Sequence, residues 1–287
     1  MTKITADSTC DLSPEILEKW NVTLAPLYTL VDSESYQDGM DITPADIFRC
    51  VEAGRKVRTA AANQYDYERL FERFSKDFEA VVHISISQQF STCFDNARLA
   101  ALGFPNVYVV DSRNLSSGSG HAVLDAAEMA RSGMKADQIV RSLREIIPRV
   151  DASFVIESLE YLRRGGRCSG LEAAGARLLQ IKPCIEVVNG EMKVGKKYRG
   201  SFEHCLEHYV RDQLEGGRDI DFSRMIVTHS GCAPETVQRV HDLVQSLAPF
   251  SELLVTRAGC TISGHCGPNT LGILFKRTRP KTAIEVR

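Results

Sequence analysis

The sequence lacks any long hydrophobic run. No apolar stretch approaches the about 20 residues that a membrane-spanning helix needs, and residues 1–7 do not begin the apolar segment of a signal peptide. These absences argue against stable membrane insertion and against export. We therefore expect a cytoplasmic protein.

An excess of charge of either sign is also absent. The 35 Lys and Arg residues nearly balance the 37 Asp and Glu residues, so the formal net charge is only −2. No block of basic residues rises above this background, and the electrostatic attraction for nucleic acid is weak. We therefore expect no nucleic-acid partner.

Paired cysteine motifs are missing as well. The nine cysteines are scattered and form no Cys-x-x-Cys pair. In a chain without an export signal, such cysteines are typical of reduced, small, buried side chains. They are Cys10, Cys50, Cys93, Cys168, Cys184, Cys205, Cys232, Cys260 and Cys266.

Common catalytic and cofactor fingerprints are absent. There is no Gly-x-Ser-x-Gly elbow and no Gly-Lys-Ser/Thr phosphate loop. Gly118-Ser-Gly120 lacks the third glycine of a dinucleotide site, and Arg163-Arg-Gly-Gly-Arg167 has no strand, loop and helix around it. We interpret these arginines as an exposed docking patch, since guanidinium groups suit phosphate or carboxylate partners. No cofactor is expected.

The length and the order of the patterns indicate two α/β domains. A chain of 287 residues exceeds one typical domain. The clearest unit is a strand at 80–86, a helix at 91–102 and a strand at 106–111, which together predict a right-handed βαβ crossover. Strand character restarts at Ser153, so we divide the chain into domains 1–152 and 153–287.

Further elements follow from hydrophobic periodicity and from helix-start signals. Strands are expected at 3–6, 22–31, 153–156, 181–188, 224–229, 253–256 and 271–275. Helices are expected to open at Ser13-Pro14 and Thr43-Pro44 and to cover 121–132, 136–147, 202–213 and 235–247.

One histidine lies in a glycine-rich segment near the C-terminus. In Ile262-Ser-Gly-His-Cys-Gly-Pro-Asn-Thr-Leu-Gly272, we expect a loop in which glycines allow close approach to a ligand. The imidazole of His265 can donate a hydrogen bond to an anion. The segment therefore predicts a site for the polar headgroup of a small molecule.

Two hydroxyl residues are weaker candidates. Ser91 stands at the predicted start of a helix that follows a strand, where it either caps the helix or faces a ligand, and both roles are compatible. Thr59 follows a basic stretch and, taken alone, is typical of a loop or an N-cap.

A metal site is the alternative. His204 and His208 are four residues apart on a predicted helix, with Cys205 between them, and His229 and Cys232 follow. Histidines at this spacing can bind zinc, but no glutamate follows the first one as in a metalloprotease motif. A solvated helix face is the simpler interpretation. The alternative function is a metal-dependent or nucleophilic hydrolase.

Several segments together resemble the DegV family, the bacterial fatty-acid-binding proteins that serve fatty acid kinase. The resemblance runs over nearly the whole chain. Its segments are Asp7-Ser-Thr-Cys-Asp-Leu12, Tyr36-x-Asp-Gly-x-Asp-Ile42, His83-Ile-Ser-Ile-Ser87, Val110-Asp-Ser112, Glu157-Ser-Leu-Glu-Tyr-Leu-Arg-Arg-Gly-Gly-Arg167, Leu179-x-Ile-Lys-Pro183 and the glycine–histidine segment.

The resemblance implies a Rossmann-like parallel sheet in the N-terminal domain and a lipid site between the two domains. One long-chain fatty acid would lie in an apolar tunnel, and its carboxylate would contact Thr59, Ser91 with its neighbour Thr92, and His265. The resemblance also implies that the protein is not an enzyme. A separate ATP-dependent kinase subunit would phosphorylate the bound lipid and would dock near Arg167 and Arg199.

Two segments depart from the family pattern. Thr59-Ala-Ala-Ala62 stands where the family usually has Thr-Ser-Gln-Pro, and Ser87-Gln-Gln-Phe-Ser-Thr92 stands where it has Ser-Ser-Gly-x-Ser-Gly. We expect these changes to alter the shape of the pocket, its chain-length preference or its ligand class. Phe90 is expected to narrow the tunnel entrance.

Overall fold

The computed structural model describes residues 1–167, 181–217 and 219–280, and its first half is built on a parallel sheet. The strand order is β2-β1-β6-β7, so β1 and β6 are neighbours although they are far apart in the sequence. Nearly every residue of β1 and β6 is buried, as expected for central strands of a parallel sheet that is covered on both faces. The strands are β1 (Thr2–Asp7), β2 (Val22–Ala25), β6 (Ala80–Ser85) and β7 (Val107–Asp111).

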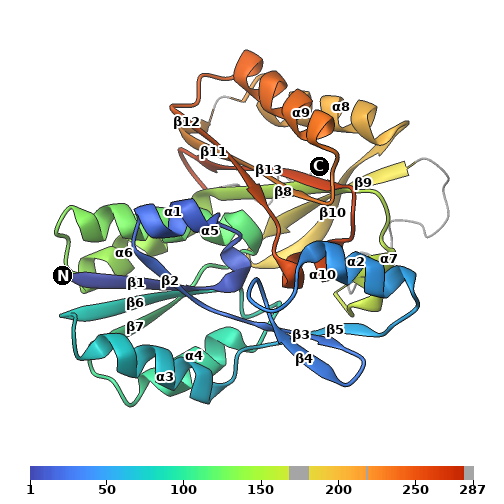
Figure 1. The fold of residues 1–287 in the computed structure, drawn as a ribbon. Coiled ribbons are helices and arrows are strands. Elements are labelled where there is room, and N and C mark those ends of the chain that lie inside the picture. Colours follow the sequence, from blue (N-terminus) through green and yellow to red (C-terminus); the bar gives the residue numbers. More distant parts are fainter. Residues whose placement is uncertain (168–180, 218, 281–287) are drawn as a thin grey trace.

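Helices cover both faces of this sheet (Figure 1). One face carries α1 (Pro14–Lys19), α5 (Ser116–Arg131) and α6 (Ala136–Ile146), and the other carries α3 (Gln64–Ser75) and α4 (Cys93–Ala101). The predicted crossover is present as β6, α4 and β7, and its two strands are parallel.

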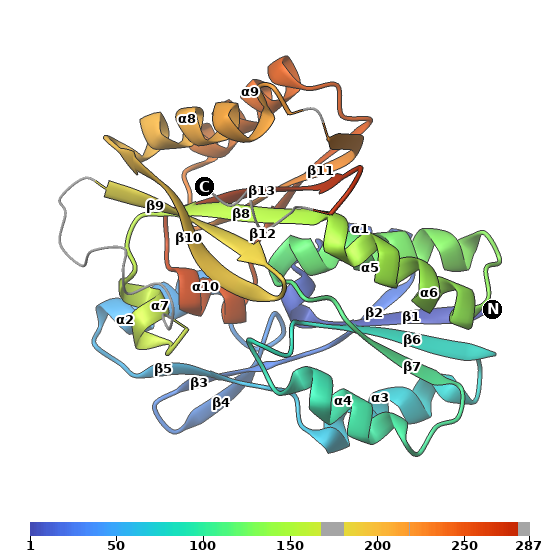
Figure 2. The same cartoon turned by 180° about the vertical axis from the view of Figure 1, so that it is seen from behind.

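The second sheet has six strands in the order β10-β9-β8-β13-β11-β12. Only β11 and β12 are parallel, and the other neighbours are antiparallel. The strands are β8 (Val150–Ile156), β9 (Ile181–Val188), β10 (Glu191–Arg199), β11 (Ile220–Ser230), β12 (Glu252–Arg257) and β13 (Thr270–Arg277). Helices α8 (Phe202–Leu214) and α9 (Pro234–Leu247) cover its outer face (Figure 2).

A small third sheet completes the structure. It pairs β3 (Tyr28–Val31) with β4 (Glu34–Gln37) and β5 (Val57–Ala60), next to the short helices α2 (Pro44–Glu52), α7 (Glu160–Arg164) and α10 (Cys260–Cys266). The predicted strand 22–31 is therefore wrong as one element. It breaks at Pro26, which has no N–H to donate, and its halves enter different sheets. Two 3₁₀ turns, η1 (Ser8–Cys10) and η2 (Ile147–Arg149), lie before α1 and β8.

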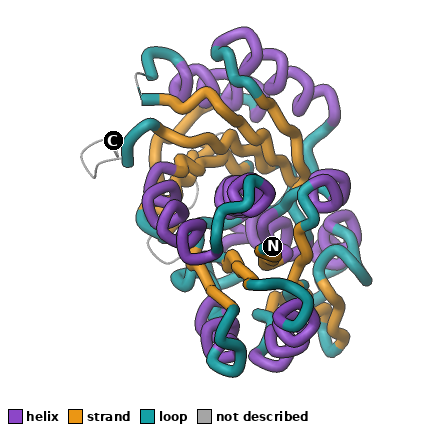
Figure 3. Tube along the Cα trace, turned by 90° about the vertical axis from the view of Figure 1, so that its left-hand side faces the viewer, coloured by secondary structure: helices purple, strands orange, loops and turns teal. Residues whose placement is uncertain are grey.

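The layers alternate through the molecule. Helices α8 and α9, the six-stranded sheet, helix α5 with its neighbours, the parallel sheet, and helices α3 and α4 follow one another (Figure 1), and Figure 3 shows the alternation from the side. The predicted α/β fold is confirmed. Strand β8 begins at Val150, three residues before the expected start, and the division into domains 1–152 and 153–287 stays a prediction.

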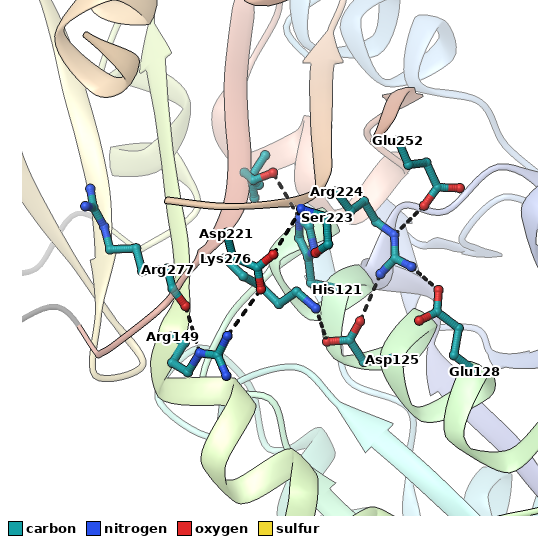
Figure 4. Close-up of polar contacts among 11 residues, drawn as sticks. His121, Asp125, Glu128, Arg149, Asp221, Ser223, Arg224, Glu252, Lys276 and Arg277 are labelled. Atoms are coloured by element: carbon teal, nitrogen blue, oxygen red, sulfur yellow. Dashed lines mark hydrogen bonds and ion pairs between the residues drawn. The ribbon is translucent and has the colours of Figure 1, made fainter. Parts of the chain in front are cut away.

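Helix α5 joins the two large sheets through a buried ion network (Figure 4). Arg224 of β11 donates from Nη1 to Asp125 Oδ1 at 2.9 Å and from Nε to Glu252 Oε2 at 2.6 Å, and it also pairs with Glu128. Lys276 of β13 donates from Nζ to Asp125 Oδ2 at 2.7 Å. The side chains of Arg224 and Asp125 are each only 6% exposed. Asp125 of α5 thus neutralises two cations of the second sheet.

No helix in the described ranges is both long and apolar enough to span a membrane.

Candidate functional site

A narrow, largely apolar cavity of about 100 Å³ lies where the three sheets meet. Its walls come from β5, β8, β9, β13, α10 and the loop after β6. Its apolar lining residues are Leu27, Ala60, Ala61, Ile86, Phe90, Leu115, Ala152, Phe154, Leu162, Val187, Met192, Ile262 and Leu274.

Thr59 and His265 meet on the wall of this cavity. Thr59 Oγ1 and His265 Nε2 are 2.8 Å apart, although the residues are 206 positions apart in the sequence. Thr59 lies in strand β5, so its expected place in a loop or at an N-cap is wrong. The structure thus brings two of the predicted headgroup residues into direct contact.

His265 is held in its neutral form. Burial, together with the positive charge of Arg167, lowers the pKa of His265 to about 4. At neutral pH the ring therefore carries one N–H, and it can still donate one hydrogen bond. Nε2 is paired with Thr59, whereas the buried Nδ1 has no hydrogen-bond partner in residues 1–167, 181–217 and 219–280.

The segment around His265 is a helix, not the expected loop. Helix α10 covers Cys260–Cys266 because a distant carboxylate caps it: Asp38 accepts from the N–H groups of Cys260 and Thr261 at 2.7 and 3.0 Å. The one conformationally demanding glycine is Gly267, which follows the helix with φ +77°. Gly272 lies inside strand β13.

Gly165, in the Arg163–Arg167 segment, lies where a side chain would not fit. A Cβ added to Gly165 would overlap Nδ1 of His265, so the absence of a side chain makes room for the imidazole ring. The segment expected to be an exposed docking patch therefore also packs against the headgroup residue.

Ser91 lines the cavity, while Thr92 does not. Ser91 Oγ accepts from the N–H of Cys93 at 3.3 Å, which is the first residue of helix α4. The N-cap of α4 is Thr92, so the expected N-cap position of Ser91 is wrong by one residue, although its hydroxyl accepts from the first helical N–H and lies on the cavity wall. Thr92 is exposed and makes no side-chain cap bond.

Arg167 is an exposed residue at the solvent side of the cavity lining. Its guanidinium donates to the carbonyl oxygen of Phe90 at 3.1 Å and to that of Gly165 at 2.9 Å. Phe90 lines the cavity beside it. Arg199 lies at the end of edge strand β10, exposed and away from the cavity lining. Arg167 thus holds the loop after β6 against the turn after α7.

A buried aspartate at the end of β1 fixes the same loop. Asp7 accepts from Ile86 N at 2.8 Å, Ser85 Oγ at 2.7 Å, Tyr67 OH at 2.6 Å and His83 Nε2 at 3.2 Å. Burial alone would raise the pKa of Asp7, but the contact with His83 and the two hydroxyl bonds outweigh it, so the pKa is lowered. The sequence signal for Asp7 was its position directly after the predicted strand 3–6. In the fold this position is the switch point between β1 and β6, where ligands of open α/β sheets bind.

The alternative metal site is not supported. His204 and His208 touch each other on the exposed face of α8, with ring centroids 4.5 Å apart, whereas Cys205 points into the core. His229 lies in β11 on the cavity wall. Across residues 1–167, 181–217 and 219–280, no group of three His, Cys, Asp or Glu residues could hold a metal ion.

The cysteines of the described ranges are free thiols, and Cys168 lies outside those ranges, as does Leu179 of the family-like segments.

Comparison with known proteins agrees with this architecture. The sequence model of the family described as "Uncharacterised protein, DegV family COG1307" matches residues 1–278. A DegV domain-containing protein of Caldanaerobacter subterraneus is 30% identical over 275 residues, which are 95% of this chain and 98% of the relative. One of Deinococcus radiodurans is 32% identical over 279 residues, or 95% and 97% of the two chains.

Solved structures show the same fold. A DegV family protein from Thermus thermophilus, described for its fatty acid binding, has a TM-score of 0.88 at 29% identity, covering 96% of this chain and 99% of its own. A stearic acid-binding protein from Eubacterium ventriosum has a TM-score of 0.83 at 26% identity, covering 97% and 99%.

Proposed function

The chain belongs to the DegV family, and from this premise we propose that it binds one long-chain fatty acid in the cavity between its sheets. The carboxylate lies against Thr59, Ser91 and His265, and the acyl chain lies along the apolar wall. The observation that carries the proposal is the Thr59–His265 pair, a polar contact set into an otherwise largely apolar cavity.

The binding free energy and the headgroup selectivity come from different parts of the ligand, the acyl chain and the carboxylate. A carboxylate removed from bulk water needs several hydrogen-bond donors, and the hydroxyls of Thr59 and Ser91 supply them. A neutral His265 that donates from Nε2 to Thr59 Oγ1 leaves the threonine proton available for the carboxylate. Each buried CH₂ contributes about 0.8 kcal/mol before ordering costs. Affinity therefore comes mainly from the acyl chain, and headgroup selection comes from the polar residues.

Replacing His265 or Ser91 with alanine is expected to weaken fatty-acid binding by about 1–3 kcal/mol, because the first change removes the residue that leaves the Thr59 proton available for the desolvated carboxylate and the second removes a donor to it. Equilibrium dialysis of labelled hexadecanoic acid with delipidated protein measures the effect. His208→Ala, which removes an exposed histidine of α8, is the control and should leave affinity unchanged. Unchanged affinity in both His265→Ala and Ser91→Ala would remove this site assignment.

We further propose that the protein presents its lipid to a separate fatty acid kinase subunit and supplies no catalytic group itself. The kinase transfers the terminal phosphoryl group of ATP to a carboxylate oxygen, which gives ADP and an acyl phosphate. The position of Arg167 at the solvent side of the cavity lining supports this, because a cation beside the exposed end of the lipid suits a partner that carries phosphate.

Arg199→Ala is expected to slow acyl phosphate formation by a kinase catalytic subunit about 3- to 10-fold, since an exposed arginine at an interface rim acts on association. Its fatty-acid affinity should stay at the wild-type value, because Arg199 does not line the cavity. Arg239→Ala, which removes an exposed arginine of α9, is the matched control. Equal rates for Arg199→Ala and the wild type would exclude Arg199 from docking.

A further inference from the structure

The cavity has a second polar region, separate from the Thr59–His265 pair. It is formed by side chains of β11, the start of α5 and α10, and its members are Ser116, Thr228, His229, Ser230 and Thr261. In a cavity otherwise lined by aliphatic and aromatic side chains, such a group needs partners for its hydrogen-bonding atoms.

Three of the five side chains have such partners within the protein. Ser116 Oγ donates to Asp11 at 2.5 Å, Thr228 Oγ1 contacts Thr256 Oγ1 at 2.8 Å, and Ser230 Oγ donates to Ser263 Oγ at 3.0 Å. These hydroxyls are accounted for by the fold, and they give no reason to expect a ligand.

Thr261 and His229 are different. Thr261 is only 4% exposed, and its buried Oγ1 has no hydrogen-bond partner among the described residues. The buried Nδ1 atom of His229 likewise has no partner within the part of the chain that the structure describes. Leaving such atoms unpaired costs free energy, so each marks a place where a ligand atom would be favoured.

The two residues are close in the fold. The backbone N–H of Ala258, three residues before Thr261, donates to the carbonyl oxygen of His229 at 2.9 Å. Thr261 precedes His265 by four residues on α10, so both lie on one helix face, about 6 Å apart along the helix axis. A ligand held by His265 therefore passes within reach of Thr261.

We propose that Thr261 and His229 bind a hydroxyl group carried by the acyl chain, so that the preferred ligand is a long-chain hydroxy fatty acid. This rests on the fatty-acid binding proposed above. A hydroxyl both donates and accepts, and it matches a threonine hydroxyl beside a neutral imidazole. Burial, together with the nearby charge of Arg257, lowers the pKa of His229, which keeps the ring neutral at pH 7.

The spacing also places the hydroxyl along the chain. An extended chain advances roughly 3.4 Å over three bonds. The about 6 Å between Thr261 and His265 along α10 then corresponds to roughly five bonds from the carboxylate. A hydroxyl in the carboxyl-proximal part of the chain meets the subsite, whereas one at the methyl end does not.

The test is a binding comparison on the full-length, delipidated protein. The probes are hexadecanoic acid and its derivatives that carry one hydroxyl near the carboxylate, in the middle of the chain or at the methyl end. We expect the acid with the hydroxyl near the carboxylate to bind about 3- to 10-fold more tightly than hexadecanoic acid. The methyl-end derivative should show no such gain.

Thr261→Val keeps the shape of the side chain and removes only its hydroxyl. This variant should bind hexadecanoic acid at least as tightly as the wild type, and its preference for the hydroxy acid should fall to about 1-fold. Thr236→Val is the matched control, because Thr236 is a buried threonine of α9 outside the cavity lining, and it should keep the preference.

The outcomes separate the two proposals. If the wild type binds hexadecanoic acid and all three hydroxy acids equally, or if the preference persists in Thr261→Val, the hydroxyl subsite is wrong and the fatty-acid site stands. If none of the four acids binds, the proposed function itself is wrong.

Discussion

Replacing Asp125 with leucine is expected to lower the free energy of unfolding by about 3–5 kcal/mol, because it leaves buried cations without their carboxylate. Among the ion pairs of the described residues, Asp125 is the one partner of Lys276, so Lys276 loses its ion pair. Arg224 loses the contact from its Nη1 to Asp125. Leucine has the same number and branching of side-chain heavy atoms as aspartate and is somewhat larger, so it opens no new cavity and the effect reports mainly the lost charge.

Urea denaturation measures this change, and an exposed ion pair provides the control. Glu72 pairs with Lys76 on α3, with side chains 62% and 73% exposed, so Glu72→Leu should change the free energy of unfolding by at most about 0.5 kcal/mol. A loss below about 1 kcal/mol in Asp125→Leu would mean that the network in Figure 4 does not hold α5 to the second sheet.

Replacing Ala152 with leucine is expected to weaken fatty-acid binding about 100-fold or more. Ala152 lies in β8 on the cavity wall, almost fully buried, and a leucine there occupies space that the acyl chain needs. Excluding about four CH₂ groups at about 0.8 kcal/mol each removes roughly 3 kcal/mol of binding free energy.

The matched control is Ala127→Leu. Ala127 of α5 is as deeply buried, but it does not line the cavity. Overpacking there costs about 1–3 kcal/mol of stability, yet the folded protein should keep its affinity for hexadecanoic acid. If Ala152→Leu binds as tightly as Ala127→Leu, the acyl chain does not lie beside β8.

The sequence predicts elements well where their patterns are local. Strand β9 was expected at 181–188 and covers Ile181–Val188, because the segment is rich in the β-branched residues isoleucine and valine. The β6–α4–β7 crossover was expected for the same reason. Strand β5 was missed because it has only four residues and depends on pairing with β3.

Helix α10 could not be predicted from its own residues. Gly264 weakens its intrinsic helix propensity, and the caps come from Asp38 and Asp11, which are more than 200 residues away in the sequence. A cap supplied by another part of the fold leaves no local signal, so His265 was expected in a loop.

For the candidate site too, local signals could be predicted from the sequence, whereas contacts between distant segments could not. Local patterns indicated His265 and, more weakly, Ser91, and the family resemblance joined them with Thr59 in one site; the structure adds that Thr59 and His265 are in direct contact. Nothing in the sequence indicated that Gly165 makes room for the imidazole, or that Arg224 and Asp125 join α5 to the second sheet. Those contacts exist only between segments that are distant in the chain.

Native mass spectrometry of protein purified without added lipid tests the fatty-acid site most directly. We expect the wild-type chain to carry the added mass of one long-chain fatty acid, plain or hydroxylated, and Ala127→Leu to carry it as well. Ala152→Leu should be detected without this added mass. A wild-type protein that carries no lipid, and that gains none after incubation with hexadecanoic acid, would contradict the account.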